Sequence, residues 1–421
     1  MIFIYTFFIR CYHLFIAMIS PFHNKAKLFT VGRKNQFERI RKQLSHAEKN
    51  IWFHCSSLGE FEQGRPLIEK IKTQYPDYKI VLTFFSPSGY EQRKNHGVAD
   101  YVYYLPADTP KNAKEFLRSI NPSFVVFIKY EFWLNFLNQL HKNNTPVFLV
   151  SAVFRENQHF FKWYGKLFKE TLFHYETIFV QNKQSVDLLL KHGITKVILA
   201  GDTRFDRVID IAKHPKRFKE IETLCKGKKV IISGSTWPED EEFILDAYHQ
   251  LKRKNNDLIL IIAPHEISEK NTLHICDLSL KFNTDYKIQL FTKDIKNEPT
   301  DILIIDTIGV LSSIYQYGDI ACIGGGFGSG IHNIAEALVY GLPVYFGPNY
   351  KKFNEAIESI ENKFGFTYTD SNELTEGISS LINDSEKLNQ LKQNSKEYIL
   401  NNAGSTEKII DYLVKKDYLR K

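Results

Sequence analysis

Short apolar stretches that alternate with helical stretches are the feature that most constrains the fold of this chain. We expect strands at 51–54, 79–85, 101–105, 124–128, 146–150, 177–180 and 197–200, and again at 230–233, 258–263, 302–305, 320–323 and 342–346. Apolar runs of this kind are typical of parallel strands that helices cover on both faces. The repeated alternation therefore predicts an α/β fold with two doubly wound halves in tandem.

The length agrees with two domains. A chain of 421 residues is too long for one ordinary core, and two domains of about 150 to 200 residues each match the usual domain size. We expect one domain over 50–211 and a second over 212–421, whose last helices could pack back on the first. The basic, strand-poor stretch 213–229 is expected to connect them.

The first 20 residues are mostly apolar and long enough to cross or enter a bilayer. A cleaved signal peptide would carry its charge before the apolar core and small residues at a cleavage site, and neither is present. Arg10 and His13 interrupt the apolar run. A single membrane span at 1–20 is the favoured interpretation, and an interfacial helix or an ordinary core helix are the alternatives.

Most of the net charge of +7 lies in the segment that directly follows these 20 residues. Residues 21–49 hold eight basic side chains against two acidic ones, a surplus of six. Such a juxtamembrane segment attracts anionic lipid and places the following domain on the cytoplasmic side. No aromatic-interleaved motif accompanies the charge, so nucleic acid is not an expected partner.

The five cysteines are scattered and odd in number, without a CxxC pair. Neither a disulfide framework nor a zinc site is indicated. The body of the protein is therefore expected in the cytosol.

The stretch 319–348 is interpreted as strand, glycine turn, helix and strand. Gly324, Gly325 and Gly326 would let backbone N–H groups approach a phosphate. A helix over 332–339 would direct its positive end to the same place, and Glu336 could accept hydrogen bonds from two ribose hydroxyls. The alternative is a plain tight turn, because glycine patterns alone are weak signals. The His-Asn-x-x-Glu sequence favours nucleotide binding.

Glu60 follows the first strand of the first domain. In an open parallel sheet, ligands bind beyond the carboxyl ends of the strands, so Glu60 is placed where chemistry occurs. A carboxylate that stabilises a helix N-terminus is the alternative. Local sequence does not decide between them.

A series of motifs then extends along the chain in a fixed order: HCSSLGE, TFFSPSGYEQ, YLPADTP, YEFWLN, GDTRFD, GSTWPEDEE, APHE, DTIGVL, GGGFGSGIHNIAEA and VYFGP. With them the chain resembles the 3-deoxy-D-manno-octulosonic acid (Kdo) transferases, which attach Kdo from CMP-Kdo to the lipid A precursor (lipid IVA) of lipopolysaccharide. The resemblance implies a GT-B fold, in which two Rossmann-like domains face each other across a cleft. It also implies inverting transfer without an obligatory metal or a cofactor.

The resemblance assigns roles to individual residues. Glu60 would be the general base that takes the acceptor proton. Arg204, where the family commonly has lysine, would stabilise charge on the reacting groups, and a surface cation is its alternative. Glu131 is the third catalytic candidate. The resemblance assigns donor binding to Ser235, Thr236, Pro264, His265, Ile308, Gly309, Val310, Gly325, Gly326, His332, Asn333, Ile334, Ala335 and Glu336.

The chain departs from the family pattern at Lys129, Ser151, Val153, His265 and Glu266. One carboxylate of a Glu-x-Glu pair is missing, and a Pro-Arg-His turn becomes Pro-His-Glu, which removes a phosphate-binding cation. An asparagine and an arginine after the fifth strand are also replaced, although Arg155 lies close by in sequence. These differences concern the transition-state contacts and not the overall assignment.

The expected function is Kdo transfer at the cytoplasmic side of the inner membrane, with CMP-Kdo, a lipid A precursor and membrane lipid as partners. One alternative is another GT-B enzyme that uses a UDP-sugar on a lipid acceptor, although a diphosphate donor usually needs more cations. The other is a membrane-tethered nucleotide-binding protein without catalysis, against which Glu60 and Arg204 argue.

Overall fold

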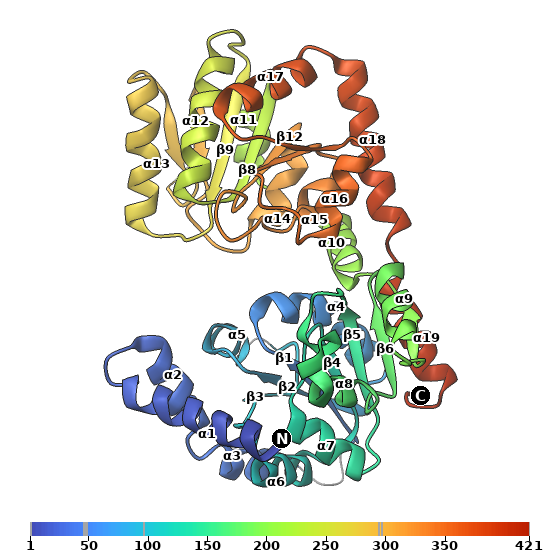
Figure 1. The fold of residues 1–421 in the computed structure, drawn as a ribbon. Coiled ribbons are helices and arrows are strands. Elements are labelled where there is room, and N and C mark those ends of the chain that lie inside the picture. Colours follow the sequence, from blue (N-terminus) through green and yellow to red (C-terminus); the bar gives the residue numbers. More distant parts are fainter. Residues whose placement is uncertain (1, 45–48, 96, 294, 296–297, 421) are drawn as a thin grey trace. The chain divides into compact units, whose positions relative to one another are not determined.

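The computed structural model describes residues 2–44, 49–95, 97–293, 295 and 298–420 (Figure 1). The chain divides into two compact units, one formed by residues 1–207 with 402–421 and the other by 208–401. Helix α10 (Thr203–Lys213) runs through this division. The expected boundary was at 211/212. The stretch 213–229, expected as a connector, belongs to the second unit and contains helix α11 (Lys219–Cys225).

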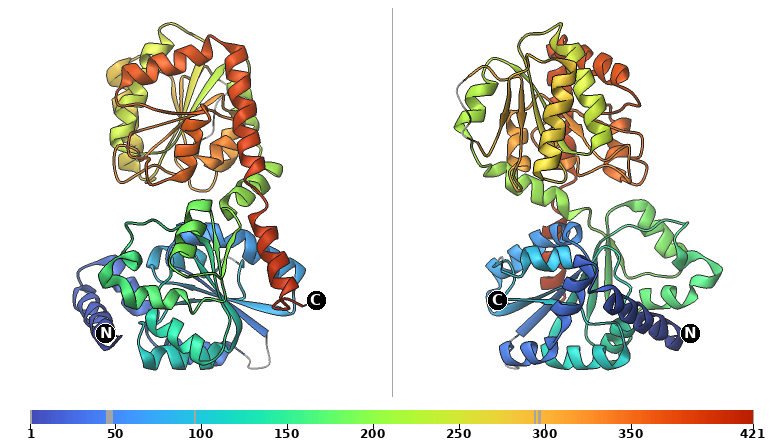
Figure 2. Two further views of the ribbon diagram at one scale, coloured as in Figure 1. Left: turned by 45° about the vertical axis from the view of Figure 1, so that its right-hand side comes forward. Right: turned by 90° about the vertical axis from the view of Figure 1, so that its left-hand side faces the viewer.

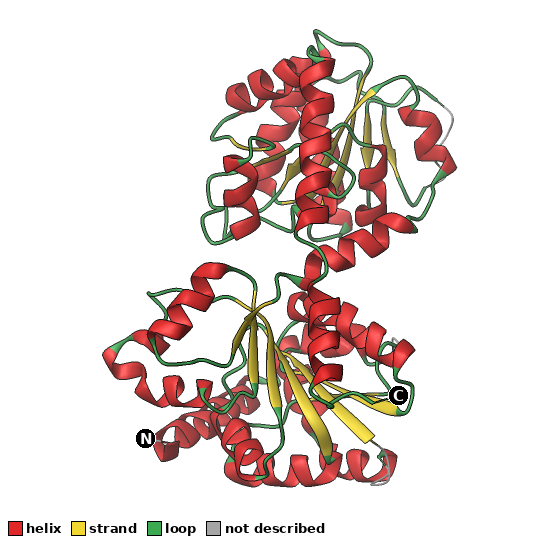
Figure 3. Cartoon of the chain, turned by 90° about the vertical axis from the view of Figure 1, so that its right-hand side faces the viewer, coloured by secondary structure: helices red, strands yellow, loops and turns green. Residues whose placement is uncertain are grey.

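The first unit is built on a parallel sheet, with described strands in the order β3-β2-β1-β4-β5-β6-β7. Its strands are β1 (Lys49–Cys55), β2 (Tyr78–Phe84), β3 (Tyr101–Tyr104), β4 (Pro122–Ile128), β5 (Val147–Ala152), β6 (Thr177–Val180) and β7 (Val197–Leu199). The helices of this unit's body are α4 (Leu58–Gln74), α5 (Pro87–Arg93), α6 (Pro110–Ile120), α7 (Leu134–Lys142), α8 (Lys166–Leu172), α9 (Lys183–Lys191) and α19 (Ser405–Lys415), with 3-10 turns η1 (His159–Phe161) and η2 (Trp163–Gly165). Helices lie on both sides of the strands (Figure 3). The predicted doubly wound fold is confirmed for this half.

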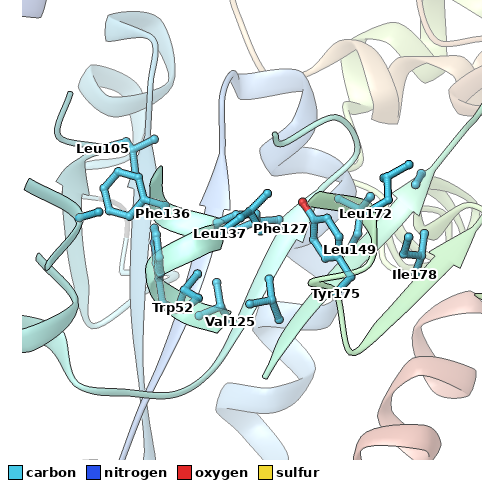
Figure 4. Close-up of a cluster of buried hydrophobic side chains, with 14 of the residues drawn as sticks. Trp52, Leu105, Val125, Phe127, Phe136, Leu137, Leu149, Leu172, Tyr175 and Ile178 are labelled. Atoms are coloured by element: carbon cyan, nitrogen blue, oxygen red, sulfur yellow. The ribbon is translucent and has the colours of Figure 1, made fainter. Parts of the chain in front are cut away.

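Successive residues of β1 point to opposite faces of the sheet, as in any strand. Trp52 packs with the rings of Phe116 of α6 and Phe136 of α7, and Figure 4 shows Trp52 and Phe136 in this apolar cluster. Phe53 lies in the other apolar layer, with side chains of α4 and of the chain-terminal α19. Both faces are therefore buried, which explains why the strand is apolar throughout.

Helices α1 (Ile2–Ile19), α2 (Asn24–Arg33) and α3 (Gln36–Gln43) precede this sheet (Figure 2). Helix α1 is long and apolar enough to cross a membrane, by length and composition alone. One side of it is attached to the unit, because the Tyr5 hydroxyl donates to Asp108 at 2.7 Å and Thr6 hydrogen-bonds with Asn135. Its other side exposes large apolar side chains, among them Phe3, Ile4, Phe7, Phe8, Leu14, Phe15 and Met18.

The expected basic segment 21–49 is mostly helical, and residues 45–48 lie outside the described ones. Arg33 differs from the expectation that the basic side chains of this segment face anionic lipid. Its guanidinium donates to the carbonyls of Leu105 (3.0 Å) and Phe85 (2.8 Å) and lies 3.6 Å from the ring centroid of Phe29. Burial lowers the pKa of Arg33 to about 9. Arg33 therefore joins α2 to the sheet and does not face lipid.

The second unit has a parallel sheet in the order β10-β11-β9-β8-β12-β13-β14 over its described residues. Its strands are β8 (Lys229–Thr236), β9 (Leu258–Pro264), β10 (Ile288–Leu290), β11 (Ile302–Ile304), β12 (Ile320–Ile323), β13 (Val344–Phe346) and β14 (Gly365–Thr367). Strands β10 and β14 were not expected, since both are edge strands of only three residues. The helices after α11 are α12 (Pro238–Lys252), α13 (Glu269–Phe282), α14 (Leu311–Ile314), η3 (Tyr315–Tyr317), α15 (Ala335–Leu338), α16 (Asn354–Glu361), α17 (Ser371–Ile382) and α18 (Ser385–Asn401).

Candidate active site

The strand order of each sheet reverses at one point, and the candidate residues gather there. In the first unit the reversal lies between β1 and β4, which precede Glu60 and Glu131 in the chain. In the second it lies between β8 and β12, where Ser235 is the second-last residue of β8 and Gly325 follows β12. Crevices for ligands form at such points of open parallel sheets.

Glu60 is the third residue of α4 and forms a capping box with Ser57. The Glu60 carboxylate accepts from the Ser57 N–H (2.7 Å) and hydroxyl (3.0 Å), and the Ser57 hydroxyl accepts from the Glu60 N–H at 3.4 Å. Glu60 therefore does stabilise the N-terminus of α4. The capping box holds the carboxylate in one orientation, as a proton acceptor would also need.

Glu131 is fully enclosed by polar partners. Its carboxylate accepts from the Ser56 N–H and hydroxyl, both at 3.0 Å, and from the Trp133 indole N–H at 2.5 Å. The Tyr175 hydroxyl donates to the Glu131 backbone carbonyl. With 1% exposure, Glu131 is positioned to hold the loops after β1 and β4 together and has little access to a substrate.

The two carboxylates influence each other through the Ser56–Ser57 turn. Burial and the charge of Glu131 raise the pKa of Glu60, whereas hydrogen bonds from Ser57 and the nearby His54 lower it. His54 is buried in β1, with Nε2 3.3 Å from the Glu131 carboxylate and Nδ1 2.8 Å from the Thr83 hydroxyl. A polar histidine inside an apolar strand was a signal for this contact that the sequence reasoning did not use.

Tyr130 is a further residue that the sequence reasoning missed. Burial raises the pKa of its hydroxyl, while Arg155, which hydrogen-bonds to it, and Arg204 lower that pKa. Glu60 also acts on the pKa of Tyr130, so Tyr130 lies within electrostatic reach of Arg155, Arg204 and Glu60. Arg155 thus places a cation next to Tyr130.

Arg204 already has an anionic partner. Its Nε and terminal nitrogen lie 2.8 and 2.7 Å from the Asp202 carboxylate, which also accepts the Arg204 N–H. Asp202 is 5% exposed. This fork orients the guanidinium and offsets part of its charge.

Two of the departures from the family pattern have left-handed backbones, Lys129 at φ 71° and Ser151 at φ 56°. The Ser151 hydroxyl is 2.9 Å from that of Thr203, which donates to the Gln63 carbonyl. Val153 is buried. Ser151 therefore serves the packing between β5, α4 and α10.

In the second unit, the glycine turn is required by close backbone packing. A Cβ on Gly324 would lie 2.2 Å from the carbonyl oxygen of Ser235, and one on Gly326 would lie 2.5 Å from the backbone nitrogen of Gly347. Ser235 itself has a left-handed backbone, with φ 55°. The turn thus fits tightly between the ends of β8 and β13.

The N–H groups of this turn are largely used by the protein, which differs from our expectation of a phosphate cradle. The Gly325 N–H donates to the Asp240 carboxylate at 2.8 Å, and that of Gly324 to the Gly234 carbonyl at 3.0 Å. The N–H groups of Gly328 and Gly330 both donate to the Gly325 carbonyl. An acidic residue at the first turn of α12, not a ligand, satisfies the centre of the loop.

The following helix is also shorter than predicted. We expected 332–339, and α15 spans Ala335–Leu338 only. The His332 N–H turns back to the Gly324 carbonyl, and the Asn333 side chain accepts from the Ala335 N–H at 3.2 Å. Four residues supply little helix dipole, so its contribution to phosphate binding is small.

His332 lies in a stack of three flat side chains. The His265 ring lies 4.9 Å from that of Trp237 and 4.2 Å from that of His332. The Trp237 indole donates to Nε2 of His332 at 3.1 Å, and burial together with His265 lowers the pKa of His332 to about 4. The His332 imidazole is therefore neutral at physiological pH and acts as an oriented ring.

The other donor-site candidates surround the same strand ends. The Asn333 amide donates to the Glu336 carboxylate at 3.1 Å and so orients it. Ile308 is 81% exposed, and Gly309 next to it has φ 82°. Thr236, Pro264, Val310, Ile334 and Ala335 are buried and form the support of these loops.

Glu241 is a buried carboxylate that the sequence reasoning missed. It accepts from the Thr236 hydroxyl at 2.9 Å, and burial raises its pKa to about 7. In the described part of the chain, no group of three or more His, Cys, Asp or Glu side chains is arranged to hold a metal ion.

Comparisons with known proteins assign the two units to glycosyltransferase domains. Residues 32–207 match the family model described as 3-deoxy-D-manno-octulosonic-acid transferase (kdotransferase), and residues 215–398 match that of glycosyl transferases group 1. A Kdo transferase of Haemophilus influenzae is 27% identical over 89% of this chain and 88% of its own length. That of Aquifex aeolicus is 26% identical over 86% of this chain and 95% of its own length.

A solved structure supports the fold. UDP-GlcNAc 2-epimerase from Neisseria meningitidis superimposes with a TM-score of 0.63 over 87% of this chain and all of its own, at 15% identity. Two parallel-sheet units of this kind constitute the GT-B type, as predicted.

Proposed function

The chain is a glycosyltransferase that belongs to the Kdo transferase family, and we propose that it transfers Kdo from CMP-Kdo to a lipid A precursor in lipopolysaccharide biosynthesis. Its similarity to named Kdo transferases over nearly the whole chain carries this proposal. The Glu60 carboxylate supports it, because the reaction needs an oriented proton acceptor and Ser57 holds this carboxylate in one orientation.

Glu60 acts as the general base. The acceptor hydroxyl attacks the anomeric carbon of Kdo with inversion, a new C–O bond forms, and the proton passes to the Glu60 carboxylate. A raised pKa makes Glu60 a better proton acceptor than an ordinary carboxylate, while the two donors from Ser57 keep it ionised. Glu131 positions this base through the Ser56–Ser57 turn and is not a second base.

The second unit binds the donor. The C–O bond to phosphate breaks, and the electron pair leaves with CMP. We assign the ribose to Glu336, which Asn333 orients. Because Asp240 already takes the Gly325 N–H, we assign the phosphate to the parts of the turn on either side of it, at Ser235 and Gly326. His332, whose pKa burial lowers to about 4, is neutral beside this turn, and the His265 ring stacks on it. We assign to the Arg204 guanidinium the stabilisation of negative charge on the reacting groups.

The protein is proposed to work at the inner membrane, with its catalytic units on the cytoplasmic side. Helix α1 exposes an apolar side, and its other side is attached to the first unit through Tyr5 and Thr6. A helix attached along one side fits the interfacial arrangement better than a free span. An amphipathic acceptor resides in the same interface.

The test is incubation of the purified full-length protein with CMP-Kdo and a tetraacylated lipid A precursor, followed by mass spectrometry. Addition of one Kdo mass or more, with release of CMP, is expected. Transfer from a UDP-sugar in its place would replace the Kdo proposal by the alternative transferase. Absence of transfer from either donor class, despite CMP binding, would indicate a non-catalytic nucleotide-binding protein.

A further inference from the structure

A hollow of about 420 Å³ lies on the outside of the first unit, within the crossover from β5 to β6. Its walls are aromatic and include Phe160, Phe161, Trp163 and Phe173. Trp163 is 92% exposed and Phe173 51%. Such a volume is within the usual range for ligand pockets, and exposed aromatic side chains of this size mark a surface that binds a partner.

The rim of the hollow is positively charged. Lys162, Lys166 and Lys169 line it together with one acidic residue, Glu170. Among the described residues, neither Lys162 nor Lys166 forms an ion pair. An aromatic floor with a cationic rim is complementary to a molecule that has an acyl chain and a phosphate.

The position of the hollow relates it to the proposed base. The crossover leaves the carboxyl end of β5, at the same edge of the sheet as the loops of Glu60 and Glu131. Phe132, next to Glu131, packs its ring 4.3 Å from that of Phe160 in the inner wall. Phe168 of α8 contacts Tyr5 of α1. Helix α1, with its exposed apolar side, is therefore a neighbour of the hollow.

We propose that this hollow binds the phosphate-bearing, acylated part of the lipid acceptor, with the acyl chain against the aromatic floor and the phosphate between Lys162 and Lys166. This inference rests on the proposed function. We assign the hollow to the acceptor and not to bulk membrane lipid, because it adjoins the Glu131 loop. A flat basic surface would suffice to bind bulk lipid.

The experiment measures transfer kinetics of the full-length protein with acceptor dispersed in neutral detergent and CMP-Kdo saturating. The double variant Lys162→Glu/Lys166→Glu is compared with Lys111→Glu/Lys114→Glu, which makes the same charge change at two exposed lysines of α6. We expect the first variant to raise the acceptor KM at least about tenfold, with kcat within about twofold. The control variant and the KM for CMP-Kdo should stay at parent values, and melting temperatures verify that both variants fold.

Two further arms identify the ligand. With an acceptor from which the phosphates have been removed, the parent and the double variant should have the same acceptor KM. Flotation with phosphatidylglycerol vesicles should show equal binding of parent and variant. Loss of vesicle binding with unchanged acceptor KM would assign the hollow to bulk lipid and overturn the proposal. Equal effects of the two double variants would overturn it as well. If the parent itself transfers no Kdo, the proposed function fails, and this outcome is distinct from a failure of the hollow.

Discussion

Replacing Glu60 by glutamine separates its two roles, as helix cap and as general base. Glutamine keeps an oxygen that can accept from the Ser57 N–H and hydroxyl. The cap then loses only the charge at the helix start, so the free energy of unfolding should fall by at most about 1 kcal/mol. Loss of the proton acceptor should reduce kcat by about 10² to 10⁴, or about 3 to 5 kcal/mol of barrier.

The assay for this variant is single-turnover transfer from CMP-Kdo, together with CMP affinity and melting temperature on the same preparation. Glu69→Gln, on the same helix but paired with Arg65 on the surface, is the matched control and should retain the parent rate. CMP affinity should not change in either variant. A folded Glu60→Gln protein that transfers Kdo at the parent rate would refute the base assignment and direct attention to Glu131.

The pH dependence of the same reaction tests the coupling of the two carboxylates. A general base must be ionised, and burial and Glu131 raise the pKa of Glu60 above its ordinary value of 4.5. The parent rate should therefore increase with pH through a midpoint above that value. Glu131→Gln removes a negative charge and should move this midpoint to lower pH. It should also destabilise the first unit by about 1 to 3 kcal/mol, because donors from Ser56 and Trp133 lose an anionic acceptor.

Three other outcomes are expected. Burial raises the pKa of Asp108 from 3.8 to about 6, so the stabilising contribution of Asp108, present at low pH, is lost as pH rises through 6. The free energy of unfolding of the parent relative to Asp108→Asn should therefore fall by about 1 kcal/mol between pH 5 and 8. Denaturant titrations that give the same difference at both pH values would contradict this. Gly326→Ala should destabilise the second unit by about 1 to 3 kcal/mol, because its Cβ meets the Gly347 backbone at 2.5 Å, whereas Gly328→Ala, whose nearest atom is at 3.8 Å, should melt like the parent. Glu336→Gln should weaken CMP binding to the full chain by about 1 to 3 kcal/mol in calorimetry, and binding of UDP as tight as that of CMP in the parent would count against a CMP-sugar donor.

The sequence alone determined the alternation of strands and helices, because apolar runs and turn residues are local signals. It predicted the strands that carry the candidate residues, including the one before Glu60 and the one before the glycine turn. It missed β10 and β14, since a three-residue edge strand is specified by its neighbour and not by its own composition. The motif order was sufficient to indicate the family, because spacing along the chain is itself sequence information.

The tertiary structure decided what each polar group contacts. Parallel pairing of β1 with β4 brings His54 and Glu131, which are 77 positions apart, to 3.3 Å. Asp240 takes the N–H of Gly325 that a phosphate cradle would have used, and Arg33 turns inward from a segment that looked like a basic flank. These contacts join residues far apart in the chain, and a hydrogen bond depends on distances and directions that only the folded chain defines.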